Sequence, residues 1–192
     1  NESGDLIITS YQNVPLAEIN GFEIEYEQVF EAIMDSPNDL LVKFNYTETE
    51  SEVIVNPGDT YINSIGTVVD AQNLLANGRD TRLQGQSDTI ANFQIGLDNL
   101  QNQTQATLIV NYVSDRVRAR GIDVLPDIIE EPPLLVDFAF SKIYSYPEFE
   151  LKLSLELRNL LDEEYYASMR NIAIYDQYDL GTSASLGFKI SF

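Results

Sequence analysis

The chain has 192 residues with no cysteine and no histidine, and its 31 acidic and 11 basic side chains give a formal net charge of −20. These absences exclude a disulfide scaffold, a thiolate metal site and the commonest general base and zinc ligand, so we expect no enzyme, no cofactor and no metal. The acidic balance also excludes a nucleic-acid partner, which normally requires a basic face. An apolar fraction of 44% is too high for a disordered chain.

Neither a spanning helix nor a leader is visible in the sequence. The longest apolar runs are only a few residues, against the roughly 20 residues that a transmembrane helix requires. The first ten residues have neither a basic start nor an apolar stretch, and there is no initiator methionine. We therefore expect this chain to be a piece of a longer protein.

The dominant pattern along the chain is a period of two, which is typical of half-exposed β-strands. A possible first strand, or the end of one, lies at Asp5–Asn13. Seven clearer segments follow, and in chain order they are Phe22–Phe30, Leu40–Tyr46, Ala91–Leu97, Ala106–Tyr112, Leu134–Phe140, Phe149–Leu157 and Ala184–Phe192. The pattern predicts an all-β fold built from seven or eight antiparallel strands.

Charge is confined to one side of these strands. No position on the seven apolar sides is charged, whereas the intervening positions include Glu23, Lys43, Asp98, Lys152 and Lys189. A membrane barrel excludes charge from its lipid face, where a charge at the midplane costs roughly 2–4 kcal/mol. A soluble β-sandwich also excludes charge from its inner face, so the alternation alone leaves both folds open.

The connections favour the membrane barrel. Short turns after Phe30, Leu97 and Tyr144 alternate strictly with three long connections, at residues 48–81, 118–133 and 162–180. Transmembrane barrels sort their loops in this way, and segments of about 9–11 residues suit a tilted spanning strand. The sequence therefore predicts an up-and-down meander in which every consecutive strand is adjacent.

Several segments resemble the end of TonB-dependent outer-membrane receptors. The run Asn159-Leu-Leu-Asp-Glu-Glu-Tyr165 is similar to the Asn-Leu-Phe-Asp-x-x-Tyr run that closes the penultimate strand in that family, with Leu161 in place of the frequent Phe. The last strand begins after Gly181-Thr182, which lacks the frequent Arg, and ends in the aromatic Phe192. Asn20–Glu25 resembles the start of an earlier barrel strand, and Arg82–Ser87 with Asn92 resembles a segment before another late strand, both in the expected order.

The resemblance implies that residues 1–192 are the C-terminal part of a 22-stranded barrel in the bacterial outer membrane. Such a barrel takes up a scarce nutrient of siderophore, cobalamin or saccharide type. The implied partners are membrane lipid and lipopolysaccharide, the barrel-assembly machinery, and a plug domain and the TonB complex, which act through a part absent from this chain. Two alternatives stay open: a self-contained eight-stranded outer-membrane barrel with a structural or adhesive role, and a soluble acidic β-sandwich binding module.

Two candidate sites follow from these patterns. The resemblance implies that the apolar end of the last strand, with Phe188, Ile190 and Phe192, is an assembly signal; the alternative is a lipid-facing strand that happens to be last. Five of the 11 basic residues gather near one predicted rim and suggest contact with an anionic ligand or lipopolysaccharide phosphates; they are Arg79, Arg82, Arg116, Arg118 and Arg120. The alternative is neutralisation of nearby carboxylates such as Asp80, Asp88 and Asp115.

Two acidic features have ordinary interpretations. Glu23, Glu25 and Glu27 alternate on one strand and predict a hydrated wall, with water or a cation between the like charges, rather than a catalytic pair. Asn56–Thr60 and Asp162–Glu164 offer oxygen ligands but lack the spacing of a calcium loop, so we interpret both as turns.

Overall fold

The computed structural model describes residues 16–31, 33, 37–63, 65–75, 80–121, 125–170 and 172–192. The candidate strand at Asp5–Asn13 and the side chain of Arg79 lie outside these residues. In the described part of the chain, every named element is a strand apart from one short 3-10 helix, η2. No helix in the described ranges is long and apolar enough to cross a bilayer.

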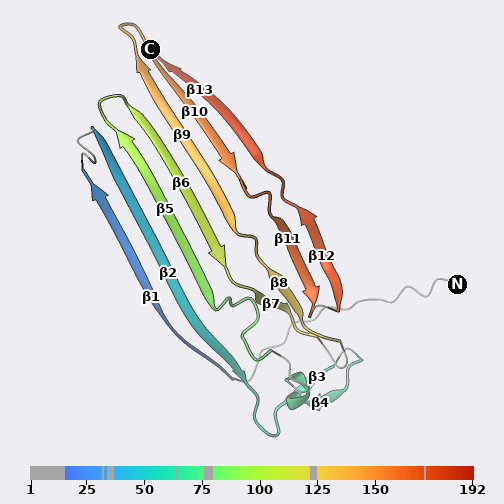
Figure 1. The fold of residues 1–192 in the computed structure, drawn as a ribbon. Helices are drawn as coiled ribbons and strands as arrows, with labels where there is room; N and C mark the ends of the chain where they lie inside the picture. Colours follow the sequence, from blue (N-terminus) through green and yellow to red (C-terminus); the bar gives the residue numbers. More distant parts are fainter. Residues whose placement is uncertain are drawn as a thin grey trace, which may run out of the picture.

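Seven antiparallel strands form one open sheet, here called the main sheet, in the order β1-β2-β5-β6-β9-β10-β13 (Figure 1). Its strands are β1 (Leu16–Phe30), β2 (Asn38–Ile54), β5 (Thr89–Asn99), β6 (Thr104–Val113), β9 (Leu135–Ser145), β10 (Glu150–Arg158) and β13 (Ser183–Ser191). These strands contain the seven predicted segments, and segments that follow one another in the sequence are neighbours in the sheet. The predicted pairing of β10 with both β9 and β13 is confirmed.

The registers bring the apolar positions of all seven strands onto one face, here called the apolar face. One hydrogen-bonded row crosses the whole sheet and is entirely apolar; it runs Phe30, Leu40, Leu97, Ala106, Phe140, Leu155 and Leu186. Lys142 extends this face beyond Phe140 at the short-turn end, where its ammonium lies 5.2 Å from the ring centre of Tyr144. The alternation chosen strand by strand from the sequence is therefore consistent across the sheet.

The opposite face, here called the polar face, is lined with hydrogen-bonding side chains. Lys43 Nζ lies 3.0 Å from Glu27 Oε1, and Asn45 Nδ2 donates to Glu23 Oε1 at 2.6 Å. Two of the three alternating glutamates thus find partners on β2. Gly21 allows the backbones of β1 and β2 to approach closely here, because a Cβ at this position would collide with the Glu48 carbonyl oxygen.

The main sheet is a single layer (Figure 1). The chain exposes 13159 Å², against about 9,200 Å² expected for a compact globule of its mass. Among the described residues, the buried apolar side chains lie toward one end of the sheet rather than in its middle; they are Val53, Tyr61, Ala71, Val117 and Ala167. Within the described residues, β1 and β13 do not pair with each other, so the sheet has two open edges.

Beyond the main sheet, the predicted long connections contain further strands. β7 (Arg116–Ala119), β8 (Ile128–Glu131), β11 (Glu164–Met169) and β12 (Ala173–Asp179) form a second sheet, here called the distal sheet, and β3 (Thr60–Ile62) pairs with β4 (Val68–Asp70) ahead of η2 (Ala71–Leu74). The distal strands continue β6, β9, β10 and β13 (Figure 1). Short interruptions separate the two sheets, and together we call them the break: Ser114–Asp115, residues 132–134, Asn159–Glu163 and residues 180–182.

The register passes through the break with its faces preserved. Arg116↔Glu130 lies five pairs beyond Asn111↔Leu135 without any inserted residue. The connection from β10 to β11 contains two residues more than the facing connection from β8 to β9, because Leu157 pairs with Phe138 and Tyr166 pairs with Glu131. An even number of inserted residues leaves the alternation of side chains between the two faces unchanged. The distal sheet therefore extends both faces of the main sheet.

Candidate functional site

Some of the polar residues that sequence analysis singled out lie together at the break. Residues 80–88 run between the end of β2 and the start of β7. Val53 N–H donates to the Thr81 carbonyl and Gly85 N–H donates to the Val117 carbonyl, at 2.7 and 2.8 Å. This segment thus lies beyond the distal end of β5, between β2 and β7, and it places Arg82 at the polar face.

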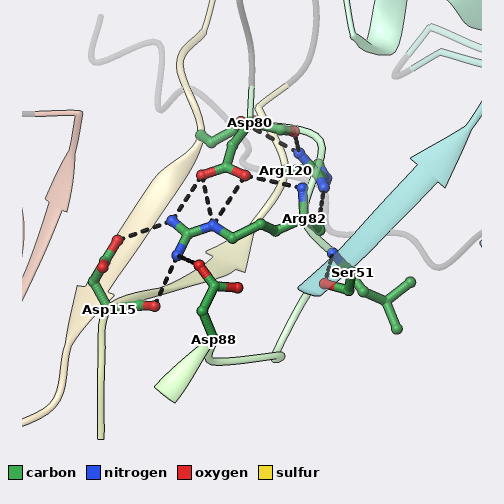
Figure 2. A network of polar contacts seen from close by, with 8 residues as sticks. Ser51, Asp80, Arg82, Asp88, Asp115 and Arg120 are labelled. Atoms are coloured by element: carbon green, nitrogen blue, oxygen red, sulfur yellow. Dashed lines mark hydrogen bonds and ion pairs between the residues drawn. The ribbon is translucent and has the colours of Figure 1, made fainter. Parts of the chain in front are cut away.

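Arg82 is surrounded by three carboxylates (Figure 2). Its guanidinium lies 2.7 Å from Asp80, 3.2 Å from Asp88 and 2.8 Å from Asp115. The hydrogen bonds and charge of Asp80 and Asp115 raise the pKa of Arg82, so its charge is fixed. Burial of Asp80 opposes its ionisation, but the hydrogen bonds from Arg82 outweigh burial and lower the pKa of Asp80.

Arg120, the residue directly after β7, binds the same segment. It donates hydrogen bonds to the main-chain carbonyls of Asp80 and Arg82 (Figure 2). Its guanidinium lies 3.5 Å from Asp127, a fully buried carboxylate that also accepts a 2.9 Å hydrogen bond from Gly121 N–H. Arg120 thereby joins the two ends of the β7–β8 connection to residues 80–82.

Arg116 and Arg118 bind a different set of partners. Arg116 Nε lies 2.7 Å from Glu130, and this hydrogen bond lowers the pKa of Glu130. Arg118 lies 3.1 Å from Asp176, donates to the Tyr165 hydroxyl at 2.8 Å and stands over the Tyr165 ring. The alternation of β7 turns Arg116 toward the continuation of the apolar face.

The predicted arginine site is therefore divided between two faces. Arg82 and Arg120 lie together, Arg116 and Arg118 lie elsewhere, and Arg79 falls outside the described residues. The pairing of Arg82 with Asp80, Asp88 and Asp115 that the alternative interpretation expected is present. Contact of any of these arginines with an anionic ligand stays a prediction.

A cavity of about 650 Å³ opens beside the Arg82 cluster. It is formed where residues 80–82, the end of β6, the start of the β8–β9 connection and the end of β11 meet. Its lining includes Asp115, Glu131, Pro132, Ser168 and Arg170. Sequence reasoning missed this cavity, since its walls come from four segments whose proximity depends on the distal sheet.

Asn159 is a second feature that sequence reasoning did not derive from the residues themselves. It is 5% exposed and has a φ of +52°, a conformation that asparagine tolerates. Its side chain donates to the carbonyls of Glu163 and Gly181 at 3.0 and 3.3 Å and accepts from Glu163 N–H at 3.0 Å. Its carbonyl accepts from the Thr182 hydroxyl at 2.9 Å, so Asn159 ties the last two crossings of the break together.

The predicted assembly signal lies on the open edge strand. Phe188 and Ile190 are 76% and 52% exposed on the apolar face, and Phe192 is fully exposed beyond the end of β13. The Phe192 ring centre lies 6.5 Å from that of Phe149, the residue directly before β10. These positions leave the three side chains accessible from the edge.

Comparisons of the chain with protein-family models, with curated proteins and with solved structures find no match.

Proposed function

We propose that this chain is the C-terminal part of a large outer-membrane β-barrel of the TonB-dependent type, an active transporter that takes up a scarce nutrient. The observation that carries the proposal is the apolar face, which has no charged residue within the seven predicted segments and continues through seven registered strands. In water, exposing the apolar surface of such a single-layer sheet would cost a free energy of roughly 25 cal/mol per Å². Lipid removes this cost, and the polar face then lines a hydrated lumen.

The slope of the apolar face supports a spanning sheet. On β1 the apolar stretch centres at Tyr26, whose row reaches Val136 on β9; on β13 it centres at Phe188, whose row reaches Lys142 through Leu153. On β9 these two rows lie at Val136 and Lys142, so from β1 to β13 the apolar stretch shifts along the strands by six residues, or about 20 Å. Most of this shift occurs between β6 and β10. The shift accumulates across six strand spacings of about 4.8 Å each. The resulting angle of about 35° agrees with the roughly 35–45° tilt of membrane barrels.

The open edges favour a large barrel over the two alternatives. A self-contained eight-stranded barrel would pair its first and last strands, whereas the described residues of β1 and β13 leave both edges open. A soluble sandwich would cover one face with a second sheet, whereas the distal sheet lies end to end with the main sheet (Figure 1). Further strands beyond both edges, to the 22 of the TonB-dependent type, would satisfy the free backbone groups.

Cysteine labelling in membranes tests the orientation of the sheet, and residues 1–192 contribute no native cysteine to the background. In the full-length protein, single cysteines at Lys152 and Glu156 should react with a water-soluble maleimide. Single cysteines at Leu151, Leu153 and Leu155 should not react. Equal labelling of both sets, or recovery of the protein outside the outer-membrane fraction, would reject the proposal.

Growth phenotypes test the transport role separately. Strains lacking this protein or lacking TonB should share a growth defect on one member of a panel of ferric siderophores, cobalamin and oligosaccharides. If the TonB-deficient strain grows normally on every nutrient that requires this protein, the barrel does not depend on TonB energy.

A further inference from the structure

We propose that the cavity beside Arg82, at the break, is a binding site for a neutral polyhydroxylated solute of the oligosaccharide type. The inference rests on the proposed function and names a substrate class for it. Under that proposal the cavity lies on the lumen side of the sheet, because Ser168 and Ile129 form a registered pair with the alternation of the polar face.

The size and construction of the cavity suit a small organic ligand. Its volume of about 650 Å³ falls within the roughly 300–1,000 Å³ of small-molecule sites. The lining combines charged side chains with two serines, Ser114 and Ser168, and with the apolar residues Ile129 and Pro132. Ser168 is 1% exposed and sits within β11, so the site is carried by a registered strand.

The charges of the lining argue against an anionic ligand. Among the described residues of the lining, three carboxylates, Asp80, Asp115 and Glu131, outnumber the two guanidinium groups, Arg82 and Arg170. The guanidinium of Arg82 already binds Asp80, Asp88 and Asp115. An anion entering here would meet unfavourable carboxylates and no uncommitted Arg82 charge, and like charges brought together cost several kcal/mol.

The same lining suits vicinal hydroxyl groups. A sugar hydroxyl both donates and accepts, so it can bond to a carboxylate oxygen and to a serine hydroxyl without introducing charge. Carboxylates fixed by arginine are preorganised acceptors, which reduces the ordering cost of binding. Glu131 is exposed at the cavity wall and makes no ion pair among the described residues, so its oxygens can serve a ligand directly. The carbon-bound hydrogens of a sugar ring can pack on Pro132.

A glycan array tests this assignment. The full-length protein, purified in detergent, is applied to neutral oligosaccharides and to sulfated and uronic-acid analogues of equal length. Neutral glycans should bind, and their charged analogues should bind at least tenfold more weakly. The Glu131→Ala variant should bind at least tenfold more weakly than wild type, whereas Glu150→Ala, which removes an exposed acid on β10 away from the cavity, should bind as wild type does.

Three results would overturn the inference: no neutral glycan binds, charged glycans bind preferentially, or Glu131→Ala binds as wild type does. Folding of each variant is established beforehand by its heat-modifiable migration in the outer-membrane fraction. A folded outer-membrane protein that binds no neutral glycan rejects only the solute class. A protein absent from the outer membrane rejects the proposed function instead.

Discussion

Leu108 of β6 and Phe138 of β9 face each other in direct register near the middle of the apolar face. On its other side Leu108 pairs with Ile95 of β5. The next residue, Thr107, points to the polar face between Gly96 and Ala139, where small neighbours leave room for a long side chain. The neighbouring residues Thr107 and Leu108 therefore lie on opposite faces of the sheet, Thr107 on the polar face and Leu108 on the apolar face.

A lysine at these two positions should have opposite outcomes. Leu108→Lys places a charge near the middle of the proposed bilayer and should destabilise the barrel by about 2–4 kcal/mol, whereas Thr107→Lys should cost about 0–1 kcal/mol. The measurement is the amount of heat-modifiable folded protein in outer membranes. Equal amounts for both variants would mean that water reaches both faces.

Asn159 should be the most sensitive polar residue of the break. Asn159→Ala removes three side-chain hydrogen bonds and places alanine at a positive φ, and we expect a loss of about 2–3 kcal/mol in unfolding free energy. Asn159→Gly keeps the backbone freedom, so it should recover about 1 kcal/mol of this loss. Urea titration of the purified protein measures both values. If alanine and glycine variants are equally stable, the backbone conformation contributes nothing.

The sequence predicted the main sheet because its signal is local. Alternation along Phe149–Leu157 or Ala184–Phe192 is set by neighbouring residues, and the registers confirm that the alternations coincide. The distal sheet escaped prediction, since Arg116–Ala119 and Ile128–Glu131 are only four residues long and too short for a periodic pattern. The Arg82 cluster depends on the distal register, which brings Asp115 beside residues 80–88.

Deleting Phe192 should reduce assembly of the full-length protein more than Thr60→Ala, a substitution in the exposed part of β3. The apolar alternation continues to the last residue, and Phe192 presents its whole ring at the open edge beyond β13. Replacement of Phe192 by tyrosine should restore most of the assembly, because an aromatic ring is retained. Folded, heat-modifiable protein is measured in outer membranes, and normal levels after the deletion would contradict the assembly signal.

The Arg82 cluster should make stability depend on pH. The pKa of Asp80 is lowered in the folded protein by its hydrogen bonds with Arg82, against the effect of burial. Such a carboxyl contributes stability above its unfolded pKa of about 3.9, and this contribution is lost as the pH falls through the lower folded value. The Arg82→Gln variant leaves Asp80, Asp88 and Asp115 together without their cation. At pH 7 we expect it to lose about 2 kcal/mol.

The pH profile separates this electrostatic effect from lost packing. The difference between wild type and Arg82→Gln should be fully present at pH 7 and pH 5, and it should shrink as the pH falls below about 3.9 and through the lowered folded pKa of Asp80. The matched control is Arg158→Gln, because Arg158 lies 3.1 Å from Glu156 but both side chains are exposed, at 69% and 51%. That exposed pair should contribute less than about 0.5 kcal/mol to the unfolding free energy at every pH measured. Thermal unfolding at pH 7, 5 and 3 provides the comparison, and a loss for Arg82→Gln that is equal at all three values would assign the role of Arg82 to packing alone.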